Sequence, residues 1–487
     1  MGNPEGSYNV GIVGAGIAGL AAAIALGRLD YKVTVYEKSK FSNETGAAIL
    51  MAPQASRILR AWGLKLPDGA VGLGMSADAG GTLVEWLRAW NPRSVNGVPS
   101  AMDSFADSAT RYGAPYVSYH RADLHAELRR LATAAGAEII LGVEVVDLDC
   151  QGGRITIHAT ETSQVETVEK DLIVVANGVK SAFASIIAGR HLPLIEGSHC
   201  MYRTLIPIER IRNDGDASKL FPDGRTNGQT LAIDNRTAAI AYPCRNGQIM
   251  NVAVQGSRAV EVFGDDWQTP ASIDEVIGML EGFDESWLAL LRLSDDIKIY
   301  RHAIREPVTS YVNGKALMIG DAAHPMTPGE LDPVCLCVSN VDVYSDAALA
   351  AGGATSLEDA AALEILLAGI PGQQGDDSLV ERMRLWELLR LPRDNTIQIL
   401  SNSQFTPRPA SALSPDIRPF LKTQLPDQVL LGLVRNTREF LSYYDVFTAA
   451  KRALRWWEEK RTMGSSLKTL PIYALEEDKV VVHFGPY

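Results

Sequence analysis

The sequence contains little cysteine and none of the cysteine patterns that define a chemistry. Its five cysteines occupy positions 150, 200, 244, 335 and 337, and no Cys-x-x-Cys pair occurs among them. Such an odd, scattered set excludes a disulfide framework and a thiol relay, and it offers no metal site without further ligands nearby. A reducing, cytoplasmic setting fits this composition best.

Three other features are missing. No apolar run reaches the length of a membrane span, and the first residues, MGNPEGSYNV, lack the basic and apolar regions of a secretory signal. Acidic residues outnumber basic ones by 58 to 46, and the resulting net charge of −12 argues against a nucleic-acid partner. We therefore expect a soluble globular protein, whose 487 residues suffice for one large or two ordinary domains.

The first forty residues predict a strand, a helix and a second strand. Residues 9–13 are short, apolar and β-branched, residues 17–29 are rich in alanine and leucine, and residues 32–36 are again β-branched. This order and spacing predict a βαβ unit.

Three glycines and one acid stand where a dinucleotide-binding turn needs them. Gly14 permits the tight turn, Gly16 lets backbone N–H groups approach a pyrophosphate, and Gly19 lets the helix pack on the strand. Glu37 ends the second strand, where its carboxylate can accept hydrogen bonds from ribose hydroxyls. We predict dinucleotide binding, but this block alone does not decide between FAD and the NAD of a dehydrogenase.

Three further blocks carry a family resemblance. They are YVSYHRADLHAELRRLATAAGAEIILG at 116–142, KDLIVVANGVKSAFA at 170–184 and GKALMIGDAAHPMTP at 314–328. With the N-terminal unit they resemble the FAD-dependent aromatic-ring monooxygenases, the salicylate- and p-hydroxybenzoate-hydroxylase-like flavoproteins. MYRTLIP and AYPCRNG make the fungal secondary-metabolite branch the most similar. The resemblance covers most of residues 9–400.

The resemblance implies an α/β fold in three parts. A Rossmann-like FAD-binding domain would comprise residues 1–75, 110–190 and 300–400. A substrate domain with a mixed or antiparallel sheet would be inserted as residues 76–109 and 191–299, where apolar and polar residues alternate as in strands. Residues 401–487 have a helical pattern, and this C-terminal region either packs against the FAD-binding domain or forms a homodimer contact.

The resemblance also implies roles for single residues. Gly14, Gly16, Gly19 and Glu37 would hold the ADP half of FAD, and Arg121 would reach the pyrophosphate. Along the flavin, Gly46 and Ala48 would line one side, Asp321 would bond the ribityl chain, Pro328 would lie nearby, and Gly352 and Gly353 would open a helix toward the pyrimidine edge. Asn177 stands where the family usually has Asp, so its role is less defined.

The implied reaction uses NAD(P)H and O2 to hydroxylate or epoxidise an aromatic, polyketide- or alkaloid-like small molecule through a flavin C4a-hydroperoxide. Since no second Gly-x-Gly-x-x-Gly follows, NAD(P)H would bind transiently. Arg203 would hold a phenolate or carboxylate of the substrate, and Tyr242 would hydrogen-bond a substrate oxygen. The plain alternative is that both are ordinary sheet residues.

One segment departs from the family pattern. GDAAHPMTP at 320–328 and GGATSLEDAAALEILLAG at 352–369 are separated in the family by a few residues, but here ELDPVCLCVSNVDVYSDAALAA, residues 330–351, intervenes. We interpret it either as a translated intron or as a genuine surface loop. In the first case the chain would be an impaired relic that does not bind FAD fully.

Overall fold

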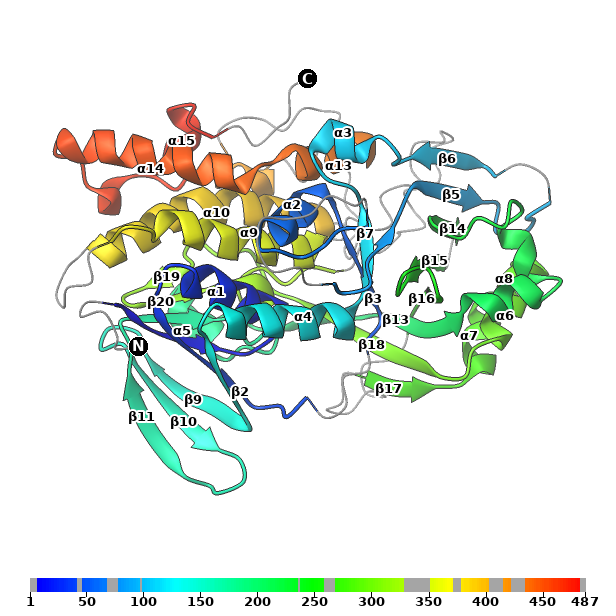
Figure 1. Ribbon diagram of the computed structural model, residues 1–487, viewed down its shortest axis with the longest axis horizontal. Helices are drawn as coiled ribbons and strands as arrows, with labels where there is room; N and C mark the ends of the chain where they lie inside the picture. The colour runs from blue at the N-terminus through cyan, green and yellow to red at the C-terminus, as the bar shows by residue number, and fades with distance from the viewer. Residues whose placement is uncertain are drawn as a thin grey trace.

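The computed structural model describes residues 7–41, 46–67, 78–96, 99–234, 237–257, 268–327, 351–370, 378–402, 415–421 and 434–481 (Figure 1). Pro328 and all but the last residue of the 330–351 segment lie outside the described residues, so the predictions made for them stay predictions.

A six-stranded sheet forms the core of one half of the molecule (Figure 1). Its strands, in spatial order, are β19 (Val312–Asn313), β20 (Ala316–Met318), β12 (Leu172–Val175), β1 (Asn9–Val13), β2 (Lys32–Glu37) and β8 (Glu138–Leu141). The apolar strand β1 lies inside the sheet, parallel to both β2 and β12. The helix that joins β1 to β2, α1 (Ile17–Gly27), is buried along its whole length. This arrangement confirms the predicted Rossmann-like unit.

Helices cover this sheet in layers. The helices are α4 (Arg121–Ala134), α5 (Phe183–Ala188), α9 (Ala351–Leu366), α10 (Ser378–Asn402), α13 (Val434–Tyr443), α14 (Val446–Thr462) and α15 (Ala474–Glu477). Helix α1 packs between α4 and α9, and α14 packs on α9 and α10 (Figure 1). The described C-terminal region is therefore helical, as predicted, and lies against the half that contains the six-stranded sheet, which carries the predicted nucleotide-binding unit.

An eight-stranded sheet forms the other half. In spatial order it contains β17 (Gln268–Ala271), β18 (Ile297–Ile304), β13 (Ile195–Pro207), β16 (Ile249–Ser257), β15 (Ala238–Cys244), β14 (Gln229–Ile233), β5 (Trp86–Trp90) and β6 (Ala101–Ser104). All its neighbouring strands are antiparallel except β14 and β5, so the sheet is mixed, as predicted. Helices α6 (Ile208–Asn213), α7 (Ile273–Met279) and α8 (Glu285–Arg292) share a hydrophobic core with it. The predicted domain bounds themselves stay predictions.

Shorter elements connect and extend the two halves. The three-stranded sheet between them consists of β3 (Ala48–Met51), β7 (Val117–His120) and β4 (Thr82–Leu83), accompanied by α2 (Pro53–Ala61) and α3 (Ser108–Tyr112). Strand β7 runs directly into α4. A separate antiparallel sheet of β9 (Val143–Asp149), β10 (Arg154–Ala159) and β11 (Val165–Glu169) projects from the nucleotide-binding half (Figure 1).

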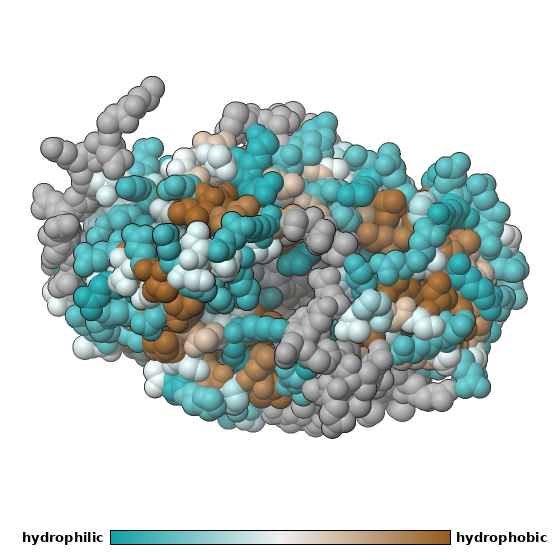
Figure 2. Space-filling view, turned by 90° about the horizontal axis from the view of Figure 1, so that it is seen from below, coloured by the Kyte–Doolittle hydropathy of each residue, from teal (hydrophilic) through white to brown (hydrophobic). Residues whose placement is uncertain are grey.

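One face of the molecule shows how polar and apolar residues are distributed on the surface. Figure 2 shows polar residues over most of one face, with hydrophobic residues in separate patches, which is ordinary for globular proteins. Among the described helices, none combines the length and the hydrophobicity that crossing a bilayer requires.

Candidate functional site

The glycine-rich turn between β1 and α1 leaves the N-terminus of the helix open. Gly14 adopts a φ of +96°, and its N–H donates to the Tyr36 carbonyl at 2.8 Å. A Cβ on Gly19 would lie 1.9 Å from the Gly14 carbonyl oxygen, whereas a Cβ on Gly16 would meet no atom within 4 Å. Two glycines therefore serve the fold, and the third keeps space free beside backbone N–H groups that carry partial positive charge.

Glu37 ties this turn to the end of β2. One carboxylate oxygen accepts a hydrogen bond from the Ala15 N–H at 2.8 Å, and the other accepts from the Ser39 N–H at 2.7 Å. Each carboxylate oxygen can accept a second bond. The carboxylate is thus held in place while it retains capacity for a hydroxyl donor.

Asp321 lies beside the first turn of α9. The preceding Gly320 has a φ of +59°, and a Cβ there would lie 2.7 Å from the Ala18 Cβ, so the backbone approaches α1 closely. A Cβ on Gly352 would lie 3.8 Å from an Asp321 carboxylate oxygen. The sequence therefore places a carboxylate at the point where α1 and α9 meet.

The Asp321 carboxylate is exposed. Desolvation by the surrounding protein raises its pKa, while the positive charges of His324 and Arg121 lower it by less. Arg121 is exposed at the start of α4, where its N–H donates to the Ala47 carbonyl at 3.0 Å. An open turn at α1, a hydroxyl-accepting Glu37, an exposed cation and an exposed carboxylate together fit a dinucleotide such as FAD.

A buried charge cluster joins the two sides of the 330–351 segment. Nε2 of His324 lies 2.8 Å from an Asp359 carboxylate oxygen that also accepts the Gly320 N–H at 3.1 Å. Burial lowers the pKa of His324, but the carboxylates of Asp359 and Asp394 outweigh it and raise that pKa to about 9. The strand end that carries Asp321 is thereby fixed to α9.

Two arginines of α10 complete this cluster. Arg390 donates to Asp359 at 3.0 Å and to Glu358 at 2.8 Å, and it also bonds Asp394. Arg393 donates twice to Glu358, at 2.8 and 3.0 Å. All these side chains are fully buried. Paired in this way, buried charges hold one geometry, and removal of a single partner is costly.

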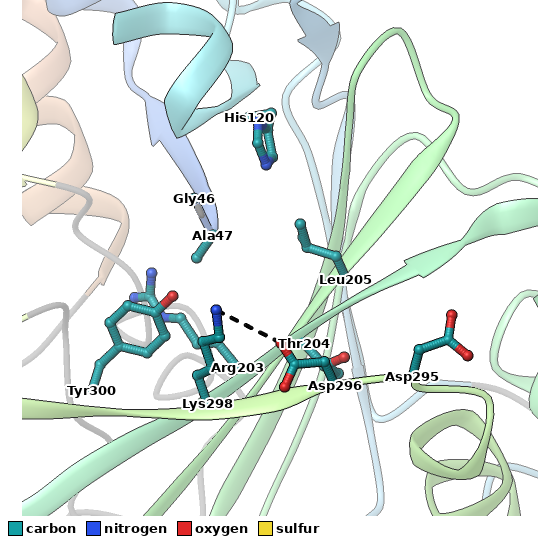
Figure 3. A pocket seen from close by; sticks show the side chains of 10 residues that line it. All are labelled: Gly46, Ala47, His120, Arg203, Thr204, Leu205, Asp295, Asp296, Lys298 and Tyr300. Carbon is teal, nitrogen blue, oxygen red and sulfur yellow. Dashed lines mark ion pairs between the residues drawn. The ribbon is translucent and has the colours of Figure 1, made fainter. Parts of the chain in front are cut away.

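A cavity of about 290 Å³ lies between the two halves (Figure 3). Its lining residues are Gly46, Ala47, His120, Arg203, Thr204, Leu205, Asp295, Asp296, Lys298 and Tyr300. Arg203 on β13 stands directly opposite Lys298 on β18. The Arg203 guanidinium lies 5.5 Å from the centre of the Tyr300 ring, and Lys298 lies 3.7 Å from Asp296.

The guanidinium of Arg203 has a hydrogen-bond donor that is not used within the described protein. Among the described residues, its Nε is buried and has no hydrogen-bond partner. The like charges of Arg203 and Lys298 lie directly opposite on neighbouring strands, and such pairs destabilise a sheet. The exposed Asp296 forms an ion pair with Lys298. The cavity therefore offers positive charge to an anionic group.

Tyr242 lies close to the cavity but does not line it. Strand register places Tyr242 level with Leu205 and on the sheet face of Arg203. Its hydroxyl donates to the Ala48 carbonyl at 3.0 Å, and the Ala48 N–H donates to the Asn251 side chain at 3.1 Å. Burial raises the pKa of Tyr242, although Arg203 lowers it. The structure thus places Tyr242 and Ala48 together behind the wall, and their predicted contacts with substrate and flavin stay predictions.

Gly46 lines the cavity, where a Cβ would come within 2.9 Å of the Ala122 N–H nitrogen. Of the ten lining residues only Gly46 and Arg203 were predicted, and the unpredicted ones include His120, Lys298 and Tyr300. A single histidine beside Arg121 carries a weak signal, but the alternation of IKIYRHAI at 297–304 could have identified β18 and its inward-facing Lys298 and Tyr300.

Comparison with known proteins gives matches over most of the chain. The family described as "FAD binding domain" matches residues 7–330. The FAD-dependent monooxygenase phomE' of Diaporthe leptostromiformis is 28% identical over 88% of this chain and 99% of its own. Hispidin-3-hydroxylase of Neonothopanus nambi is 26% identical over 81% and 87%, and 3-hydroxybenzoate 6-hydroxylase 1 of Aquipseudomonas alcaligenes is 27% identical over 65% and 75%. A solved salicylate hydroxylase substrate complex shares the fold, with a TM-score of 0.65 at 19% identity over 92% of this chain and 98% of its own.

Proposed function

The chain belongs to the FAD-binding-domain family and is a flavoprotein monooxygenase, and from this premise we propose that it uses NAD(P)H and O2 to hydroxylate a phenolic aromatic compound. The single observation that carries the proposal is the cavity beside the nucleotide-binding half, with an unsatisfied arginine in its wall. We further propose a fungal secondary metabolite, of polyketide or alkaloid type, as the substrate, because relatives from fungi include a monooxygenase and a hydroxylase named for hispidin.

We propose the following placement of FAD. The ADP half lies along the glycine turn, with its ribose at Glu37 and its pyrophosphate at the open N-terminus of α1, within reach of Arg121. Asp321 accepts a hydrogen bond from the ribityl chain, and the first turn of α9, with Gly352 and Gly353, faces the flavin. When bound, the flavin would accept a hydride from NAD(P)H and would then activate O2.

The positive wall of the cavity selects the substrate. Arg203 offers a planar guanidinium that can hold a phenolate or carboxylate by two parallel hydrogen bonds. Lys298 stands opposite Arg203 across the strands, so an anion between them offsets their mutual repulsion. Ala47, Leu205 and the ring of Tyr300 supply apolar wall for an aromatic ring.

Tyr242 has a supporting role in this proposal. Together with Asn251 it clamps the backbone of Ala48, and this clamp fixes Gly46 and Ala47 at the cavity wall. Substitution of Tyr242 by Phe should therefore weaken substrate binding modestly and leave the reaction itself intact.

Turnover with labelled oxygen tests the proposal. FAD-loaded protein is mixed with NADH or NADPH and with salicylate, 3-hydroxybenzoate or hispidin, and the consumption of cofactor and O2 is followed. We expect at least one phenolic ring to accelerate cofactor oxidation and to gain one atom of labelled oxygen. If no phenol is oxygenated by protein that holds its full FAD, the proposed activity is wrong.

A further inference from the structure

A histidine lies across the cavity from its two cations. His120 is the last residue of β7 and immediately precedes α4, and its side chain is 6% exposed. Figure 3 shows its imidazole on the wall opposite Arg203 and Lys298, with Ala47 and Leu205 at its sides. The side chain does not cap α4, because it makes no capping hydrogen bond. His120 therefore occupies the N-cap position of α4, but its side chain is not used to cap the helix.

One ring nitrogen of His120 faces a fixed carboxylate. Nδ1 is buried and has no hydrogen-bond partner among the described residues, and it lies 3.4 Å from an Asp123 oxygen, so the carboxylate acts on it through its charge. Arg245 grips Asp123 with two hydrogen bonds, at 2.6 and 2.8 Å. Burial raises the pKa of Asp123, but Arg245 and His120 lower it by more. The net pKa lies below the ordinary value, so the carboxylate is ionised at neutral pH.

The backbone supports this grip. Arg245 and Asn246 form the turn between β15 and β16 with φ values of +50° and +55°, a conformation that costs free energy in residues other than glycine. Asn246 N–H also donates to the Gly80 carbonyl at 3.0 Å. The turn thus holds Arg245, and through it Asp123, in a defined place.

The other ring nitrogen is available to a ligand. A carboxylate beside Nδ1 favours the tautomer with the proton on Nδ1, which leaves the Nε2 lone pair free to accept a proton. Among the described residues, no hydrogen bond to Nε2 exists, and His120 lines the cavity. A buried imidazole with a free lone pair, oriented by a carboxylate, is the arrangement of a general base.

We propose that His120 is a catalytic residue that removes the proton from the phenolic hydroxyl of the substrate, an inference that rests on the proposed hydroxylation. The O–H bond breaks, its electron pair stays on oxygen, and the proton forms a new bond to Nε2. Asp123 stabilises the imidazolium, which returns the proton to water after product leaves. The phenolate ring is richer in electrons and so reacts faster with an electrophilic oxygen donor.

This proposal divides the cavity into two ends. The hydroxyl that ionises lies at His120, and a second acidic group, such as a carboxylate, lies at Arg203 and Lys298. The charged and titratable groups around His120 and its cavity come from several elements. They are Arg121, Asp123, Arg203, Arg245, Asp295, Asp296, Lys298 and Tyr300.

The test compares His120→Gln with His191→Gln, a control at an exposed histidine outside the cavity. With phenols whose hydroxyl is weakly acidic, kcat/KM of His120→Gln should fall by about 10²–10⁴-fold at neutral pH. FAD occupancy should stay unchanged. The loss should shrink as pH rises and as the phenol becomes more acidic, because an ionised phenol needs no base. A loss of equal size for all phenols and all pH values would overturn the assignment.

A binding measurement separates this inference from the hydroxylation itself. At mildly acidic pH, 4-nitrophenol bound to the wild-type protein should absorb as the phenolate, and 4-nitrophenol bound to His120→Gln should absorb as the neutral phenol. Identical spectra would refute the base, whereas a phenolate spectrum without any oxygenation would refute only the proposed function. Asp123→Asn should lower kcat/KM for weakly acidic phenols more than for 4-nitrophenol, because the protonated His120 loses the carboxylate that stabilises it.

Discussion

The imidazolium of His324 should make the stability of the protein depend on alkaline pH. Its folded-state pKa, raised from 6.5 to about 9, means that the folded protein binds this proton more tightly than the unfolded chain does. The stabilisation is therefore complete below pH 6.5 and is lost as pH rises through about 9. A pKa difference of about 2.5 at about 1.4 kcal/mol for each unit gives about 3.5 kcal/mol in total, of which about 3 kcal/mol is lost between about pH 6 and about pH 10. The matching fall in the pKa of Asp359, to about 2, describes the same contact and is not added.

Urea unfolding at about pH 6 and about pH 10 measures this effect. Trp386 reports on the cluster, since its indole N–H donates to the Asp359 carbonyl at 3.0 Å. The wild-type free energy of unfolding should fall by about 3 kcal/mol more than that of His324→Gln over this interval, because all other groups titrate in both proteins. His191→Gln should behave as wild type. Equal losses in wild type and His324→Gln would show that His324 is not held as an imidazolium.

Further substitutions separate folding from ligand binding. Gly19→Ala should prevent folding, since its Cβ would lie 1.9 Å from a backbone carbonyl oxygen, whereas Gly16→Ala, with no atom within 4 Å, should fold and lose FAD affinity in a flavin-fluorescence titration. Arg390→Met leaves buried carboxylates without their cation and should cost about 3–5 kcal/mol in urea unfolding, whereas Arg292→Met removes an exposed ion pair and should cost at most about 1 kcal/mol. Arg203→Met should keep FAD but weaken the calorimetric binding of phenolic acids roughly tenfold to a hundredfold, the loss of a hydrogen bond to a charged group, with little effect on neutral phenols. Equal weakening for acids and neutral phenols would contradict a charge-recognising arginine.

The nucleotide-binding unit could be predicted from the sequence because its constraints are local. Gly14 and Gly19 are required by contacts within the turn and its helix, so their spacing alone specifies the geometry. Steric requirements between residues close in sequence therefore appear as a fixed spacing of glycines, which can be recognised in the sequence.

The composition of the cavity wall depends on contacts between distant segments. Tyr242 and Arg203 share one sheet face, but the neighbouring Ala48, nearly 200 positions away in sequence, takes the Tyr242 hydroxyl. His120 reaches the cavity only because β7 packs between the two halves. Strand register and the packing of one half on the other decide these roles, and a pattern of alternating residues does not encode them.

In the cluster around His324, local structure could likewise be predicted from the sequence, whereas the contact between distant segments could not. The run GDAAHP predicts a strand end, and the EDA run lies in a predicted helix. The structure adds that His324 bonds Asp359, so the segments on either side of residues 330–351 meet directly.

The flavin content of the purified full-length chain tests the central claim most directly. If the chain, with residues 330–351 retained, is an FAD-dependent monooxygenase, it should be yellow, and its absorption spectrum should correspond to one FAD for each chain. A folded but colourless protein that takes up no added FAD would contradict the account, and it would favour the interpretation of an impaired relic.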